Sequence, residues 1–341
     1  MRSIRKTVRS QGDAPPVRTS FTLAILDPAA GTDNIGDEFI VEAAARFLAG
    51  LFPYARLLRV PTHHPIGPLG RGMLDQSALR VIAGSNILPS RIATQSQWIV
   101  RERDAPALAG LTCMGVGWQT TEAPDAATIA FLKRVLDPDR IHSAREPMTA
   151  DRLEALGFRA LMTGCPSMWS LTPDHCAAIP TTRAEDVVLT LSTGARDAAL
   201  DGALVALLRR RYRRIWYFPQ HWGDLTALLP HGLAQISPVP PRRDAYDTLL
   251  RSHAVDYVGL RLHGGVRALQ HRRRALILPV DHRATGMAEG TGLPIAARED
   301  LDGIAAWIDG ARPTRITLPG AAIAAWHAQF RGWKPVARLS L

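Results

Sequence analysis

The sequence predicts an α/β fold with two halves whose parallel sheets face a common cleft. Short apolar runs alternate with amphipathic helical patterns, and this alternation occurs on both sides of a segment rich in Pro, Thr and Ala (Pro173–Asp186). The 341 residues also suffice for two domains of ordinary size. Apolar strands that alternate with helices are typical of parallel sheets covered on both faces, and such sheets bind ligands at the carboxyl ends of their strands.

Six apolar runs predict the strands of the first half, of which the last two are weak: Phe21–Leu26, Ala55–Val60, Leu79–Ala83, Leu111–Val116, the region of Ile141, and Ala160–Met162. Apolar residues three to four positions apart predict helices over Glu38–Leu51 and Ala126–Leu136. In the second half the predicted strands are Val187–Leu191, Ile215–Phe218, Asp256–Leu260 and Ala275–Val280, with helices over Ala198–Arg210 and Arg243–Ser252. We expect the last helical stretch, Ala321–Gly332, to pack back against the first half.

These patterns divide the chain into five parts. We expect a flexible basic tail (1–19), a first domain (20–178), a linker (179–186), a second domain (187–317) and a C-terminal helical segment (318–341). The tail lacks the apolar core of a secretory signal, and no run of 18 apolar residues predicts a membrane span. Three cysteines without CxxC spacing disfavour disulfides and zinc, so we expect a cytoplasmic protein.

The formal net charge of +10 comes almost entirely from arginine, because only three of the 41 basic residues are lysine. Two runs concentrate this charge, Arg209–Arg214 and His271–Arg274. Each run is typical of a solvated surface, or of contact with an anionic partner such as the phosphorylated headgroup of a glycan lipid on the inner membrane face. No zinc finger, RNA-stacking motif or basic zipper accompanies them, so we expect no nucleic-acid partner.

The segment Asp256–Ala268 is typical of an anion site. A buried-strand pattern delivers Arg261 and His263 to the pair Gly264–Gly265, where a helix begins. Glycines let backbone N–H groups approach a ligand, and the helix start adds partial positive charge. The competing interpretation is structural: Arg261 would pair with a carboxylate and His263 would be a satisfied core residue.

Other strand ends carry similar turns. Thr32–Glu38 follows the first strand, and within it Asp37 is predicted either to cap the next helix or to enter the cleft. Ala83–Asn86 and Met114–Trp118 are small-residue turns. No GxGxxG follows a strand and no GxxxxGK[ST] occurs, which disfavours dinucleotide and P-loop sites.

Four more polar turns follow predicted strands. Ser143–Glu146 places Arg145 as an anion clamp, or as the partner of Glu146 or Asp151. In Thr163–Ser167 we interpret Cys165 as a buried structural thiol, because no positioned His is expected near it. The last two turns, Pro219–His221 and Val280–Arg283, add His221, Asp281, His282 and Arg283. This convergence at strand ends favours a site.

Taken together, these elements resemble those of the polysaccharide pyruvyl transferase family. The matching elements occur in the family's order over roughly residues 20–300: Asn34–Glu38, Gly84–Asn86, Ser143–Glu146, Thr163–Pro166, Arg261–Gly265, Asp281–Arg283 and Gly292–Pro294. The chain departs from the family at Asp33, where a glycine is usual. The resemblance implies two Rossmann-like domains with parallel sheets facing a cleft, arranged as in GT-B glycosyltransferases. The first domain would face the acceptor and the second would bind the donor.

The resemblance also implies a function. Phosphoenolpyruvate would be the donor, and a sugar hydroxyl pair of a cell-surface polysaccharide or its lipid-linked precursor would be the acceptor of a pyruvate ketal. It assigns Arg261, Leu262 and His263 to the donor, with Arg145 as a second donor arginine. The remaining expected substrate contacts are Asn34, Gly36, Asn86, Gly264, Gly265, His282 and Arg283.

The chemistry suits these residue types. Phosphoenolpyruvate carries a phosphate and a carboxylate, which Arg145 and Arg261 could clamp. Ketal formation needs an acid and a base of near-neutral pKa. We expect His263 to be the acid or a phosphate contact, and Asp37, His221 or Asp281 to be the base. The scheme requires no metal or cofactor. A GT-B glycosyltransferase that uses a nucleotide-sugar and a non-catalytic glycan-binding protein are the alternatives.

Overall fold

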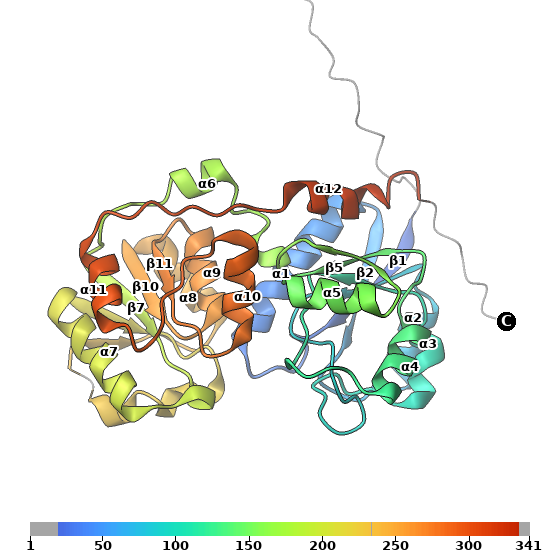
Figure 1. The fold of residues 1–341 in the computed structure, drawn as a ribbon, viewed down its shortest axis with the longest axis horizontal. Coiled ribbons are helices and arrows are strands. Elements are labelled where there is room, and N and C mark those ends of the chain that lie inside the picture. The colour runs from blue at the N-terminus through green and yellow to red at the C-terminus, as the bar shows by residue number, and fades with distance from the viewer. Residues whose placement is uncertain (1–19, 233, 334–341) are drawn as a thin grey trace, which may run out of the picture.

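The computed structural model describes residues 20–232 and 234–333 and consists of two α/β lobes side by side (Figure 1). All strand pairs within the sheets are parallel. The first sheet has the order β2-β1-β3-β4, and a pair β5-β6 continues beside β4 through hydrogen bonds between residues 116 and 143–145. Its strands are β1 (Phe21–Asp27), β2 (Ala55–Pro61), β3 (Leu79–Ala83), β4 (Leu111–Met114), β5 (Ile141–Ala144) and β6 (Arg159–Met162).

The second sheet has the order β11-β10-β7-β8-β9. Its strands are β7 (Asp186–Thr190), β8 (Arg214–Tyr217), β9 (Ile236–Pro238), β10 (Val255–Gly259) and β11 (Ala275–Ile277). The α-helices are α1 (Ile35–Leu51), α2 (Pro68–Asp75), α3 (Ala105–Leu108), α4 (Ala126–Val135), α5 (Pro147–Ala155), α6 (Pro173–Ala177), α7 (Ala198–Arg211), α8 (Arg243–Ser252), α9 (Leu262–Gln270), α10 (His282–Thr291), α11 (Leu301–Asp309) and α12 (Gly320–Ala328). Short 3-10 turns are η1 (Glu102–Asp104), η2 (Pro166–Met168), η3 (Thr193–Ala195), η4 (Trp222–Thr226) and η5 (Leu229–His231).

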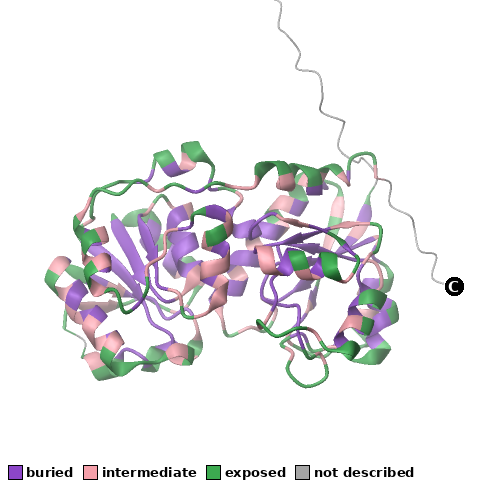
Figure 2. Ribbon diagram, viewed as in Figure 1, coloured by how far each residue is buried: buried purple, intermediate pink, exposed green. Residues whose placement is uncertain are grey.

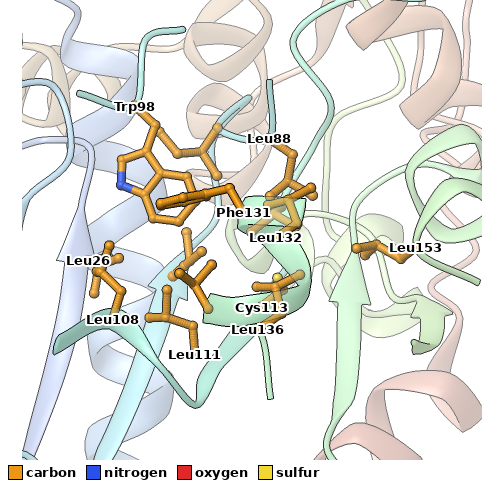
Figure 3. Close-up of a cluster of buried hydrophobic side chains, with 14 of the residues drawn as sticks. Leu26, Leu88, Trp98, Leu108, Leu111, Cys113, Phe131, Leu132, Leu136 and Leu153 are labelled. Carbon is orange, nitrogen blue, oxygen red and sulfur yellow. The ribbon is translucent and has the colours of Figure 1, made fainter. Parts of the chain in front are cut away.

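Both sheets are buried on both faces, which explains why their strands read as continuous apolar runs. In β1, Leu23 and Ile25 belong to one core cluster, whereas Ala24 and Leu26 belong to the cluster on the opposite face. Figure 3 shows the cluster that contains Leu26, in which Trp98 packs near Phe131. In Figure 2 the strands are mostly buried and the outward faces of the covering helices are exposed.

Helix α1 belongs to the cores of both lobes. Ile35, Phe39 and Ile40 pack into a cluster of the second lobe, and the Phe39 ring lies 6.0 Å from that of Tyr246. Val41, on the same helix, packs into the first lobe. An ion pair of 3.1 Å between Glu42 and Arg267 on α9 adds a polar contact between the lobes. The two lobes are therefore joined by packing as well as by the chain.

The chain crosses between the lobes twice. The first crossing includes α6, so the segment Pro173–Asp186 is partly helical. After α11 the chain returns to the first lobe, where the indole of Trp326 on α12 is fully buried and donates to the carbonyl of Cys113 at 3.1 Å. The predicted tail (1–19) and residues 334–341 lie outside the described residues.

Several sequence predictions need correction. The strand expected over Ala275–Val280 ends at Ile277, shortly before Pro279, which has no backbone N–H to donate. The strand expected over Leu111–Val116 ends at Met114, because Gly115 turns the chain with a positive φ of 62°. The run His271–Arg274 is not simply a solvated face. Arg274 is 1% exposed, donates to the Trp307 carbonyl and lies over the Trp307 ring. No helix among the described residues is long and apolar enough to cross a bilayer.

Candidate active site

A cavity of about 40 Å³ lies where the strand ends of the two lobes meet. Six of the predicted site residues line it: Asn34, Arg261, Leu262, His263, Asp281 and Arg283. Gln220, Leu260, Val280 and Ala284 complete the lining. Arg261, His263 and Arg283 therefore face one small space at the seam between the lobes.

Arg261 stands at the N-terminal end of α9 and is bound to a buried carboxylate. Its Nε donates to Asp224 Oδ2 at 2.8 Å, and its second contact with Oδ1 makes the pair bidentate. Asp224 is fully buried and also accepts the N–H groups of Thr193 and His221. This pairing realises the structural interpretation of Arg261, while the side chain still lines the cavity.

Gly264 and Gly265 have a different place from the one predicted. They lie in the first turns of α9 and do not line the cavity. A Cβ at Gly265 would lie 2.4 Å from Ile277 Cγ1, and one at Gly264 would lie 2.9 Å from Gln220 Oε1. The glycines are needed because α9 packs closely on the sheet and on the neighbouring loop.

His263 is almost completely buried on the first turn of α9, and its Nε2 lies 3.6 Å from Cys165 Sγ. Ser167 Oγ donates to the same sulfur at 3.0 Å. Burial lowers the pKa of His263 to about 3, and the charges of Arg145 and Arg283 contribute. The expectation of a near-neutral pKa is therefore wrong for this structure, and the imidazole is neutral at pH 7.

The prediction that Cys165 is a buried structural thiol is confirmed, because its side chain is fully buried. The expectation that no His would lie near it is wrong, since His263 is in direct contact with it. Burial raises the pKa of the Cys165 thiol, so it is not a thiolate nucleophile. Its position makes it a hydrogen-bonding neighbour of His263.

Arg145, at the end of β5, is 1% exposed and held on two sides. Its Nε donates to Glu146 Oε2 at 2.8 Å and its NH2 to Asn86 Oδ1 at 2.9 Å. Glu146 is in turn bound by the Trp118 N–H and the Thr149 hydroxyl. Arg145 does not line the cavity, but its charge reaches His263. It is a fixed cation behind the cavity wall.

Asp37 is buried in the first turn of α1, and its carboxylate accepts from Ser85 Oγ and Thr32 Oγ1, both at 3.0 Å. Burial raises its pKa. The capping interpretation of Asp37 is wrong, because Asn34 caps α1 by accepting the Gly36 N–H. Asp37 is thus a stronger base than an exposed aspartate, and its carboxylate is fixed by two hydroxyl groups.

The turn after β11 brings Asp281, His282 and Arg283 to the cavity region. Asp281 caps α10 and accepts from Arg283 Nε at 2.8 Å. Burial raises the pKa of Asp281, but the hydrogen bonds and charge of Arg283 outweigh it and leave the pKa low, so this carboxylate is a weak base. His282 Nε2 lies 3.2 Å from the Trp118 carbonyl of the other lobe.

His221 occupies the seam between the lobes. Its Nδ1 accepts the Gly223 N–H at 3.0 Å, its Nε2 lies 3.5 Å from Asp33, and its backbone pairs with Asn34. Both ring nitrogens thus have neighbours in place. This engagement weakens the case for His221 as the base.

The sequence of the chain matches the family model described as polysaccharide pyruvyl transferase over residues 34–282. The chain belongs to the polysaccharide pyruvyl transferase family. The match begins at Asn34 and ends at His282, so it includes every predicted site residue except Arg283. No curated protein matches the chain in a sequence search.

Solved structures agree with the fold that the family implies. UDP-GlcNAc 2-epimerase of Methanocaldococcus jannaschii, in complex with UDP-GlcNAc and UDP, matches with a TM-score of 0.50 and 9% identity, over 88% of this chain and 95% of that chain. S. aureus MnaA in its co-structure with UDP matches with a TM-score of 0.49 and 10% identity, over 86% and 92%. The first likeness establishes the GT-B-like arrangement of two Rossmann-like domains for this family member.

Two site residues escaped the sequence analysis. Gln220 lines the cavity, and its Nε2 donates to Asn34 Oδ1 at 3.1 Å. Its Oε1 is buried and has no hydrogen-bond partner among the described residues. The sequence signal for Gln220 was its position in the turn Pro219–His221, at a predicted strand end. The sequence holds no such signal for Asp224, because its partner Arg261 lies 37 residues away.

The site contains several charged groups but no assembled metal centre. Within residues 20–232 and 234–333, no group of three or more His, Cys, Asp and Glu side chains is arranged to hold a metal ion. The chemical resources are three arginines (Arg145, Arg261 and Arg283), one neutral imidazole, and the carboxyl group of Asp37. These groups suit the binding of an anion and the movement of protons.

Proposed function

We propose that the protein transfers the pyruvate unit of phosphoenolpyruvate to a pair of sugar hydroxyls, forms a pyruvate ketal and releases phosphate. The acceptor is a cell-surface polysaccharide or its lipid-linked precursor. The observation that carries this proposal is the cavity at the seam between the lobes, where the side chains of Arg261, His263 and Arg283 line one space. Family membership supports the same reaction class.

The arginines divide the work of binding the donor. Arg283 is 39% exposed and pairs with Asp281, so it can turn toward a phosphate or carboxylate. Arg261 keeps its bidentate contact with Asp224 and offers its remaining N–H groups. A bound dianion would offset the positive charges around His263 and raise its pKa toward the range where it can carry a proton.

The atoms balance without a cofactor. The methylene carbon of the donor takes one proton, the first hydroxyl bonds to C2, the C2–O bond to phosphate breaks, and the second hydroxyl bonds to C2. Of the two hydroxyl protons, one replaces the proton consumed at the methylene carbon and the other leaves on phosphate. We assign the acceptor-side proton transfer to Asp37, because burial raises the pKa of its carboxyl group, whereas the contacts with Arg283 lower the pKa of Asp281 and make it the weaker base.

Phosphate release from phosphoenolpyruvate in the presence of candidate acceptors tests this proposal. Arg261→Ala and His263→Ala should each lower kcat/KM by about 100-fold or more. Arg91→Ala, which removes an exposed arginine paired with Glu122, is the matched control and should leave turnover unchanged. Unchanged turnover in the two site variants would disprove the donor-site assignment.

Thermal unfolding separates the proposal from the nucleotide-sugar alternative. Phosphoenolpyruvate should raise the melting temperature and UDP-GlcNAc should not, because a ligand stabilises only the state that binds it. Protection by UDP-GlcNAc alone would favour the glycosyltransferase. If neither ligand protects the chain and no variant changes turnover, the non-catalytic alternative holds.

A further inference from the structure

Three large apolar side chains lie exposed on one short segment of the second lobe. Trp222 is 68% exposed, Leu225 39% and Leu229 64%. They are three and four positions apart on the turns η4 and η5, whereas Asp224, Ala227 and Leu228 between them are buried. Trp222 and Leu225 are three positions apart on one 3-10 turn and so lie on the same side of it, and Leu229 is exposed on the next turn. We call this exposed apolar segment the η4–η5 face.

Arginines border this face. The Arg209 guanidinium donates to the carbonyls of Gly232 at 2.8 Å and Ala234 at 3.2 Å, just after η5. Arg210 follows on the same helix and is exposed. Arg196 is exposed directly after η3, and η3 is held to η4 through the Thr193 N–H and Asp224.

Few carboxylates oppose these charges. Between residues 221 and 235 the sequence has one acidic residue, Asp224, which is buried and paired with Arg261. Asp33 and Asp197 stand at the margins, where Asp33 contacts His221 and Asp197 caps α7. The η4–η5 face is thus apolar at its centre and cationic along its border.

The remainder of the basic run Arg209–Arg214 is used within the fold. Arg211 pairs with Asp309, Arg213 pairs with Asp186, and Arg214 lies over the Trp216 ring. The charge available to a partner is therefore smaller than the sequence alone indicates, and it lies beside the exposed tryptophan and leucines.

The η4–η5 face also adjoins the candidate active site. His221 caps η4 and pairs through its backbone with Asn34 of the cavity lining. Asp224, inside the same turn, holds Arg261. A surface bound to this face would lie next to the place where the two lobes meet.

We propose that the η4–η5 face docks on an anionic lipid bilayer. An exposed tryptophan suits the headgroup level, the two leucines can enter the acyl boundary, and arginines are attracted to anionic headgroups. Docking would bring the cleft to a lipid-linked acceptor, and in this respect the inference rests on the proposed function. The contact is peripheral and needs no membrane-spanning helix.

Co-sedimentation of the full-length protein with vesicles tests the docking. Vesicles of phosphatidylcholine mixed with phosphatidylglycerol should bind the protein at least about tenfold more tightly than phosphatidylcholine alone, and salt should weaken the binding. The double variant Trp222→Ser/Leu229→Ser should lose about tenfold or more of this affinity. Arg196→Gln/Arg210→Gln should abolish the preference for anionic vesicles.

Matched controls keep the test specific. The double variant Tyr54→Ser/Leu69→Ser removes two large side chains of the first lobe that are 52% and 74% exposed. It should bind vesicles like the unaltered protein. All variants should keep phosphate release with a soluble acceptor. Equal binding to both vesicle types, unchanged binding by the Trp222/Leu229 variant, or a concentration-dependent dimer that this variant abolishes would each overturn the proposal.

The vesicle assay contains neither phosphoenolpyruvate nor an acceptor. Docking without phosphate release would therefore contradict the proposed reaction but not the docking proposal. Phosphate release without docking would contradict the docking proposal but not the proposed reaction.

Discussion

On the first lobe's side of the cleft, Arg145 is 1% exposed and fixed by Glu146 and Asn86. On the second lobe's side, Arg283 is 39% exposed and paired with Asp281, only two residues before it. Both charges act on His263. One cation is therefore built into a buried network, whereas the other can exchange its partner for a ligand.

This difference separates two ways in which an arginine serves an anion site. A buried pair is preorganised, and its field acts at a fixed place without rearrangement. A partly exposed pair adds less to stability than a buried one, and its arginine can turn toward a dianion that arrives from solvent.

The largest expected effect comes from breaking the buried pair. Arg145→Gln leaves the Glu146 carboxylate buried without its cation, so the free energy of unfolding should fall by about 3 kcal/mol or more. Phosphate release should be lost as well. Urea unfolding and the phosphate assay measure the two effects.

A second substitution separates folding from function. Arg145→Gln/Glu146→Gln removes both charges and should recover most of the stability without restoring phosphate release. If Arg145→Gln alone keeps full stability, the contrast between a fixed and a movable arginine is wrong.

The next effect is expected at Arg283. Arg283→Gln should lower kcat/KM for phosphoenolpyruvate by about 100-fold, because a direct donor contact is lost. The free energy of unfolding should change by less than about 1 kcal/mol, since the pair with Asp281 is partly exposed. A large loss of stability with normal activity would reverse the roles assigned to the two arginines.

The smallest effect is the acid sensitivity of stability that comes from the burial of His263, with a contribution from the charges of Arg145 and Arg283. Its pKa is about 3 in the folded protein and about 6.5 when unfolded, so between these values only the unfolded chain takes up the proton. Stability should fall as the pH falls below about 6.5. At pH 5.5 this loss amounts to about 1.4 kcal/mol.

Replacing the imidazole isolates this contribution. His263→Asn should lose less stability between pH 7.5 and 5.5 than the unaltered protein, by about 1.4 kcal/mol. His142 and His327, whose pKa values burial also lowers to about 4, are present in both proteins and cancel in the difference. Parallel stability curves for the two proteins would contradict the lowered pKa.

Most of the strands could be predicted from the sequence, because a buried parallel strand is a local run of apolar residues. It did not reveal β9 (Ile236–Pro238), a short edge strand that ends in proline and is only partly buried. The alternation of strands and helices was likewise sufficient for the two-lobe arrangement, which the family and the fold comparison support.

The site was less accessible because its partners are distant along the chain. Placing Arg261 at a strand end needed only local pattern, but pairing it with Asp224 depends on how β8 and β10 flank β7. The contact between Cys165 and His263 joins residues of different lobes, 98 positions apart. The lowered pKa of His263 depends on burial created by both lobes, which no local spacing encodes.

The sharing of α1 between two cores has a consequence for biosynthesis. The ribosome delivers Ile35, Phe39 and Ile40 early, but their packing partners Tyr246 and Val266 come much later. Until then this face of the helix is an apolar surface on a nascent chain, of the kind that chaperones cover. Trp326, which closes the first lobe, is made later still. The N-terminal lobe is therefore translated first but completed last.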